Sequence, residues 1–374
     1  MINRKRLIKL TQKLIRINSE NPPGDEYRIA RFVEDYLGAL GLKAKIYEFK
    51  KRRSNVIAEL RGASKHSLLL TPHLDTVPAG GSWRFPPFSA RIYKNKIYGR
   101  GATDCKANLA CALEVIKSLI EDKTELDYNL IFAATADEES GSDLGLIPLL
   151  NNGILTPDAA VVLDSDDFDI VVTQKGLLHI KIKIQGKKAH GAYPWHGINA
   201  IDTAIKIIGA LKMRKPRYPK NEYLRPPTMN VGTIKGGDKV NIVADWCEVE
   251  LDFRFLPGMS GEKLLQEIKN ITRKYSRKFK IEVEGIQKPY EINKHHSLVS
   301  SLIRAMRKLK IKPKIKGSEG ATVITFFQGK GIPAVATGFG SGGTAHTSDE
   351  YVKIGNLYLG ALALEEFLKN YQFS

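Results

Sequence analysis

Short, continuously apolar segments alternate with amphipathic helical segments in the first half of this chain, and this alternation restricts its fold most. Three of these apolar segments are typical of strands that are buried on both faces of a sheet: residues 67–75 (SLLLTPHLD), 129–134 and 159–163. Apolar residues at helical spacing predict helices over 27–40 and 107–120. Such strands need covering helices, so the pattern predicts an α/β fold.

The pattern changes near residue 174. Residues 177–186 (LLHIKIKIQG) alternate Ile and Lys with period two, which is typical of a half-exposed antiparallel strand. Two predicted helices, 199–211 and 261–277, are interleaved with further alternating strands. The α/β pattern then returns. We therefore expect a discontinuous first domain of residues 1–173 and 286–374, with a smaller α+β (ferredoxin-like) domain of residues 174–285 inserted in it.

Composition excludes several classes of protein. The chain has 374 residues, of which 43% are hydrophobic and 26% charged, and this argues against a disordered or low-complexity chain. Three cysteines with no CxxC pair cannot form a disulfide framework, so we expect a reducing compartment, the cytoplasm. No stretch has the ~20 apolar residues that span a bilayer, and we expect no membrane partner.

The formal net charge of +18 raises the question of a nucleic-acid partner. Residues 174–285 hold 22 Lys+Arg and 11 Asp+Glu, so +11 of this charge lies in the predicted second domain and +7 in the rest. Because no aromatic–basic RNA-binding signature accompanies it, we interpret the excess as solvated lysine on exposed faces. A polyanion-binding protein with a vestigial metal site is the alternative from another class.

Residues that can bind a metal recur where the predicted buried strands end. They are His73, Asp75, Asp137, Glu138, Glu139 and Asp164, joined by Asp104 just before a predicted helix and by His346 in GTAHTSDEY. The carboxyl ends of strands in an open α/β sheet gather at one edge, where sites form. Carboxylates crowded there repel one another unless cations compensate. Two divalent metal ions would do so, and imidazole with carboxylate suits Zn²⁺, or else Co²⁺ or Mn²⁺.

At these residues the chain resembles the co-catalytic zinc amidohydrolases and exopeptidases that include acetylornithine deacetylase, succinyl-diaminopimelate desuccinylase, aminoacylase and carboxypeptidase G. The resemblance covers nearly the whole chain. It rests on these segments, in order: PHLDTVPAG, WRFPPFSA, YGRGATDCKANLA, ATADEESGS, VVLDSDD, GKKAHGAYPWHGINA, NIVAD, LDFRFLPG and GTAHTSDEYV.

The resemblance implies a mixed-sheet, zinc-exopeptidase-like catalytic domain and makes the inserted domain a lid and dimerisation domain. It implies a metal-dependent hydrolase that cleaves the amide bond of N-acyl amino acids or short peptides, as a deacetylase or desuccinylase does. A dipeptidase or carboxypeptidase of the same family is the alternative. The acyl group and the amino acid stay open.

The resemblance also implies a metal-ligand set. His73 and Asp164 would bind one ion, Glu139 and His346 would bind the other, and Asp104 would bridge both, since a carboxylate has two oxygens.

The resemblance also implies roles for two further residues of the first domain. Asp75 would hold the His73 imidazole from behind. Glu138 would be the general base, which takes a proton from a metal-bridging water and passes it to the leaving amine.

In the second domain, the resemblance implies that His190 reaches the active site of the partner subunit of a homodimer and donates to the developing oxyanion. Arg254 would pair with the substrate carboxylate, and Asn230 and Asn241 are candidate polar contacts. The residues alone also allow an ion pair of Arg254 with a strand neighbour and a turn-setting role for Asn241. Many relatives carry a Gly-Gly-Thr-Asp-like loop, where this chain has GSEGATVITFF with Glu319.

Overall fold

The structure is a computed structural model that describes residues 1–373, and its contacts divide the chain into two compact units. The first unit contains residues 1–172, 292–316 and the part of the chain from residue 322 onward. The second unit contains residues 173–291 together with the short segment 317–321. The return of residues 317–321 to the second unit has no counterpart in the sequence pattern.

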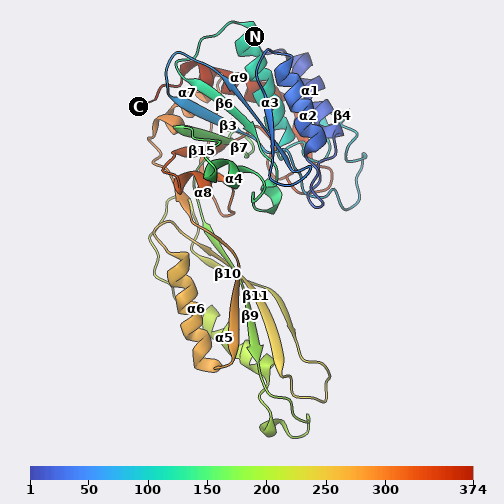
Figure 1. The fold of residues 1–374 in the computed structure, drawn as a ribbon, viewed down its shortest axis with the longest axis vertical. Helices are drawn as coiled ribbons and strands as arrows, with labels where there is room; N and C mark the ends of the chain where they lie inside the picture. Colours follow the sequence, from blue (N-terminus) through green and yellow to red (C-terminus); the bar gives the residue numbers. More distant parts are fainter. Residues whose placement is uncertain (374) are drawn as a thin grey trace. The chain divides into compact units, whose positions relative to one another are not determined.

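A nine-stranded mixed sheet lies mainly in the first unit and confirms the α/β class (Figure 1). The strand order is β1 (Lys45–Glu48), β2 (Ser54–Leu60), β6 (Asn129–Ala134), β3 (Ser67–Thr71), β7 (Ala159–Leu163), β15 (Ala334–Thr337), β8 (Ile170–Gln174) and β13 (Tyr290–Glu291), with β14 (Ile315–Ser318) paired to β8. The three strands that the sequence marks as buried on both faces are β3, β6 and β7. They are neighbours and run parallel, so their carboxyl ends lie at one edge.

Helices cover this sheet. Helix α3 (Lys106–Glu121) packs against α1 (Arg4–Arg16) and α9 (Ile354–Asn370), and α9 packs in turn against α7 (Ser297–Lys308). Helix α2 (Tyr27–Gly38) lies on β1 and β2, α8 (Ile324–Gln328) lies on β15, and α4 (Leu146–Asn151) follows the turn η1 (Glu138–Ser140). Among residues 1–373, no helix is long and apolar enough to cross a membrane.

A small antiparallel sheet of β4 (Arg91–Tyr93), β5 (Lys96–Tyr98) and β16 (Tyr351–Lys353) completes the first unit. The register pairs Tyr98 with Tyr351. This pairing brings the segment that follows β5 next to the segment that precedes β16. Asp104 lies in the first of these segments and His346 in the second, so the small sheet helps to assemble the site.

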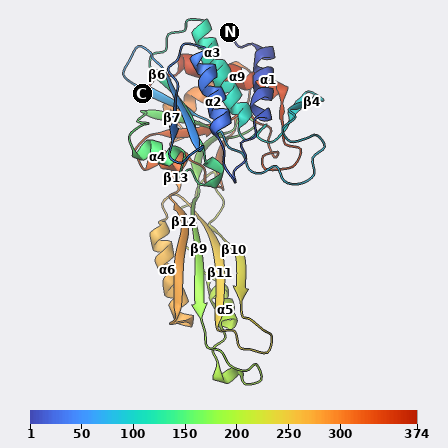
Figure 2. The same cartoon turned by 45° about the vertical axis from the view of Figure 1, so that its right-hand side comes forward.

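The second unit has a βαββαβ order: β9 (Gly176–Gln185), α5 (Ala200–Lys212), β10 (Thr228–Gly236), β11 (Trp246–Phe255), α6 (Gly261–Tyr275) and β12 (Phe279–Gln287). Its four strands form an antiparallel sheet in the order β10-β11-β9-β12, which is a ferredoxin-like arrangement (Figure 2). The 3₁₀ turn η2 (Pro194–His196) lies between β9 and α5. The Ile residues of β9 join a core with α5 and α6.

The lysines of β9 lie on the opposite face and are paired. Lys181 contacts Glu250 at 3.0 Å and Glu284 at 2.8 Å, and Lys183 contacts Glu282 at 2.8 Å. These carboxylates come from the two strands beside β9. The period-two pattern of β9 therefore places its isoleucines on the face that packs against the helices and its lysines on the face where they pair with carboxylates.

We predict that Leu113→Ala lowers the free energy of unfolding by about 2–5 kcal/mol, because the side chain is fully buried in α3 and its loss leaves a cavity. Leu359→Ala in α9 is the control, since Leu359 is 37% exposed and its truncation should cost little. Urea unfolding followed by circular dichroism compares the two. Equal losses for both variants would contradict the prediction.

Candidate metal centre

Three parallel strands deliver acidic and imidazole side chains to one edge of the sheet. Beyond β3 the chain reaches His73, which is 2% exposed and lies on a parallel β-bridge to Thr135 at the end of β6. Glu138 and Glu139 follow β6, and Asp164 follows β7 directly. Parallel neighbours end together, so these side chains converge as the sequence predicts.

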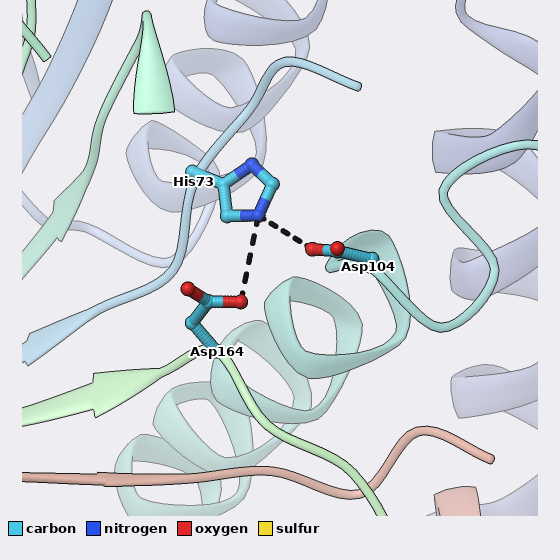
Figure 3. A group of neighbouring side chains, drawn as sticks. All are labelled: His73, Asp104 and Asp164. Carbon is cyan, nitrogen blue, oxygen red and sulfur yellow. Dashed lines mark hydrogen bonds and ion pairs between the residues drawn. The ribbon is translucent and has the colours of Figure 1, made fainter. Parts of the chain in front are cut away.

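The first cluster joins His73, Asp104 and Asp164. The Nε2 atom of His73 lies 2.8 Å from Oδ1 of Asp104 and 3.8 Å from Oδ1 of Asp164 (Figure 3). Figure 3 shows the edge of the imidazole pointing between the two carboxylates, with Asp164 at the end of β7 and Asp104 ahead of α3. The three ligand atoms lie within 4.8 Å of one another, so one cation can contact all of them.

The second cluster joins Asp104, Glu139 and His346. The Nε2 atom of His346 lies 3.2 Å from Oδ2 of Asp104 and 3.1 Å from Oε2 of Glu139. Asp104 therefore offers Oδ1 to one cluster and Oδ2 to the other, as a bridging carboxylate must. The second oxygen of Glu139, Oε1, is buried with no hydrogen-bond partner in the described chain. An orphaned buried oxygen and a shared carboxylate both fit a pair of divalent cations.

Asp75 lies behind the first cluster and connects it to the second. The Nδ1 atom of His73 is 2.9 Å from the carbonyl oxygen of Asp75 and 3.5 Å from its carboxylate. The same carboxylate accepts the backbone N–H groups of Glu138 and Glu139, each at 3.1 Å. Asp75 thus orients the imidazole and holds the turn that carries both glutamates.

Arg100 and Glu350 form a second support, which the sequence did not reveal. Glu350 is fully buried, and its carboxylate accepts N–H groups from Gly101, Thr103 and Asp104 at 2.8–3.0 Å. Arg100 donates to Glu350 at 2.7 Å and to the carbonyl oxygens of residues 78, 79 and 347. This pair fastens the segment with Asp104 to the segments that carry His73 and His346. Glu350 lies four residues after His346, but a single sequence does not distinguish a buried carboxylate from a solvated one.

Arg53, Glu26, Asn21 and Asp137 form a third group; the sequence indicated only Asp137, as a candidate metal ligand, and the structure places it outside both clusters. Arg53 donates to Glu26 and Asp137, and Asn21 donates to Asp75 at 2.9 Å and to Asp137 at 3.3 Å. All four residues are buried. The segments around residues 21–26 and residue 53 thereby contact Asp137, which directly precedes Glu138.

Crowding and burial shift the pKa values of the carboxylates at this centre. Burial raises the pKa of Glu138 well above its ordinary value, and the nearby charge of Asp164 adds to the rise. Burial and the charge of Asp104 raise the pKa of Asp164 to about 7. Burial opposes ionisation of Asp104 as well, but hydrogen bonds from His346 and His73 outweigh it and lower its pKa. A carboxylate held ionised between two others is a natural cation site.

His190 and Asn241 lie together in the second unit. His190 is exposed, forms a β-bridge with Ile242, and accepts the N–H of Ala192 on Nδ1 at 3.0 Å. The N–H of Gly191 donates to the carbonyl oxygen of Asn241 at 2.8 Å. The contact uses the backbone carbonyl of Asn241 and joins its segment to the turn beside His190.

Arg254 and Asn230 share the helix-free face of the second sheet. Both lie beside Asp252: Asn230 is its cross-strand partner in β10, and Arg254 follows two residues later in β11. Nε and Nη2 of Arg254 donate to Asp252 at 2.9 and 3.2 Å. In this structure Arg254 therefore forms the ion pair with a strand neighbour that the residues alone allow. Its Nη1 atom donates no hydrogen bond within residues 1–373. Glu319 belongs to the same unit and pairs with the buried Lys175 at 2.5 Å.

A mixed α/β sheet with two clusters that share one carboxylate is an arrangement typical of two-metal hydrolases. The sequence profile of Peptidase family M20/M25/M40 matches residues 69–370. The chain belongs to this family.

Relatives extend over the same length. An uncharacterized metallohydrolase of Methanocaldococcus jannaschii is 30% identical, over 97% of this chain and 98% of the relative. Acetylornithine deacetylase of Vibrio cholerae is 30% identical, over 88% of this chain and 87% of the relative.

Solved structures agree on the fold. The crystal structure of aminopeptidase PepT from Bacillus cereus has a TM-score of 0.83 and 25% identity, covering 98% of each chain. That of a tripeptidase from Staphylococcus aureus has a TM-score of 0.81 and 28% identity, covering 99% of this chain and 98% of the other. The prediction of a metallopeptidase or amidohydrolase enzyme is confirmed.

We predict that metal affinity rises with pH. In the metal-free protein, hydrogen bonds to Asp104 and Glu139 raise the pKa of His346 to about 10, and the pKa of Asp164 is raised to about 7. Both groups bind a cation only after losing their protons, so protons compete with metal below these pKa values. Chelator competition from pH 6 to pH 9 and calorimetry in two buffers measure affinity and proton release. A pH-independent affinity without proton release would contradict this.

Proposed function

We propose that this enzyme hydrolyses the amide bond of N-acyl amino acids or short peptides, with Zn²⁺ as the metal of the centre. The observation that carries the proposal is the pair of clusters that share Asp104 and have Glu138 beside them. His73 and Asp164 would hold one ion, Glu139 and His346 the other, and Asp104 both. Imidazole and carboxylate without thiolate suit Zn²⁺, and Co²⁺ or Mn²⁺ could replace it.

Two divalent ions would supply Lewis-acid polarisation of the scissile carbonyl and acidify water at neutral pH. The chain itself supplies the proton transfer. Glu138 is no member of either cluster, its backbone N–H is held by Asp75, and its pKa is raised by burial. We assign it as the general base that takes a proton from the attacking water and returns it to the leaving amine.

Residues of the second unit would hold the substrate. Arg254 is oriented by Asp252 and keeps Nη1 free for a carboxylate, and Asn230 is exposed on the same face. Because Nδ1 of His190 accepts an N–H, the neutral ring carries its proton on Nε2, and this proton can be donated to an oxyanion. Asn241 supports the His190 turn. The second unit would then act as lid and dimerisation domain.

Exposed apolar side chains surround His190 and support a homodimer. Trp195 is 72% exposed and Val240 is fully exposed, and Tyr193 and Ile198 are more than half exposed. Exposed apolar groups gathered in one place are typical of an interaction site. We propose a second copy of this chain as the partner, placed so that His190 serves the other subunit.

The deacylase interpretation follows the acetylornithine deacetylase relative. The peptidase alternative has its own support, because the solved structures at 25–28% identity are an aminopeptidase and a tripeptidase. The polyanion-binding alternative is weaker, since the lysines of β9 are already paired with carboxylates and the ligand set is intact. All three cysteines are free and buried, which supports the proposed cytoplasmic setting.

We expect the zinc-loaded enzyme to release amine from one class in a panel of N-acetyl amino acids, N-succinyl-diaminopimelate and dipeptides, and the stripped enzyme to be inactive. Glu138→Ala should lower kcat by about 10²- to 10⁴-fold with metal content unchanged, since only the base is removed. Glu125→Ala, an exposed glutamate, is the matched control. Full activity of the Glu138 variant would refute the mechanism, and turnover of no substrate by metal-loaded enzyme would refute the proposed substrates.

Subunit mixing tests the role of His190. His190→Ala and Glu138→Ala homodimers should each be nearly inactive. A mixed dimer would keep one complete site, with Glu138 from one subunit and His190 from the other, so random mixing should restore about a quarter of wild-type activity. If His190 serves its own subunit, no activity returns. A fully active monomer in sedimentation would also contradict the dimer.

A further inference from the structure

Arg53 is a buried cation that the proposed mechanism leaves without a role. Its side chain is 8% exposed and donates to two carboxylates at once. Nε and Nη2 contact Glu26 at 2.7 and 2.8 Å, and Nη2 also contacts Asp137 at 2.7 Å. Within the described chain, neither Glu26 nor Asp137 forms an ion pair with any other residue. Arg53 alone neutralises these two buried charges.

The loop before α2 is built around this guanidinium. Gly24 has a φ of +78°, and a Cβ placed on it would lie 2.4 Å from Cζ of Arg53. A side chain at this position would therefore displace the guanidinium, and the backbone conformation also favours glycine. Two residues later, Glu26 presents both carboxylate oxygens to Arg53. Such a planar, two-point contact is specific to arginine.

Asp137 connects Arg53 to the turn that carries Glu138. It has a φ of +66°, in the left-handed region that non-glycine residues rarely adopt. Its carboxylate accepts Arg53 and the N–H of Leu144 at 3.0 Å, and its own N–H donates to Glu26 at 3.3 Å. Because Glu138 is the next residue, the conformation of Asp137 sets the direction in which the Glu138 side chain leaves the chain.

We propose that Arg53 is a positioning residue for the proton transfer by Glu138 and that it acts through Asp137. The inference rests on the proposed role of Glu138 as general base. Without Arg53, the Glu26 and Asp137 carboxylates face each other buried and without a counter-charge. Movement of Asp137 relieves this repulsion and turns Glu138 away from its working position. Zinc stays bound at saturating concentration, because the Glu139 side chain is also held by His346 at 3.1 Å, and none of the other proposed ligands contacts Asp137.

The test compares Arg53→Met and Arg53→Lys with Arg52→Met in the zinc-saturated enzyme. Arg52 is the matched control, since it is the neighbouring residue, is exposed, and pairs with Asp25, which is also partly exposed. Arg53→Met should lower kcat by about 10- to 100-fold, as misplacement of a catalytic group by about 1 Å does. Its KM, zinc content and circular dichroism spectrum should match wild type. Arg53→Lys keeps the charge but lacks the planar fork, so it should recover only part of the rate.

Wild-type kcat in folded Arg53→Met overturns the inference, and so does a rate loss that follows loss of zinc. If Arg53→Met does not fold, Arg53→Lys decides: a lowered kcat at unchanged KM and zinc content supports the inference, and a wild-type kcat overturns it. The proposed function fails separately. In that case wild type itself shows no zinc-dependent hydrolysis, or Glu138→Ala is fully active.

Discussion

Carboxylate crowding is the constraint on which the rest of this structure depends. Glu138, Glu139, Asp104 and Asp164 meet at one edge of the sheet with only two imidazoles among them. Such a set is costly unless cations share it. The two oxygens of Asp104 point into different clusters, and this division lets one carboxylate serve two metal ions. The parallel order of β3, β6 and β7 brings the ligands to this edge.

Buried ion pairs hold the ligands in place from behind. Arg100 with Glu350 fixes the segment of Asp104, and Arg53 with Glu26 reaches the turn of Glu138 through Asp137. Each pair is more than nine-tenths buried, so each would be expensive if half of it were removed. Exposed pairs such as those on β9 contribute little by comparison. This difference in burial distinguishes the ion pairs that support the site from the ion pairs on the surface.

The two units divide the chemistry. The first unit contains both clusters and the proposed base, and the second contains the residues proposed to bind substrate and oxyanion. The family relationship extends along the whole chain, which agrees with both units being parts of one enzyme. Exposed apolar groups around His190 explain why the second unit is proposed to meet another copy of the chain.

The α/β class and the edge of the sheet followed from apolar periodicity and polar strand ends, which are local signals readable in one chain. The choice of His73, Asp104, Glu139, Asp164 and His346 among the candidate ligands came from the family resemblance, and the structure brings these five side chains together. Only the tertiary structure decided which other charged residues are buried. Arg53 meets Asp137 and Arg100 meets Glu350 across 84 and 250 residues of chain, and no local pattern marks such contacts. Burial of a charge is a property of the partners that surround it, and folding alone brings those partners together.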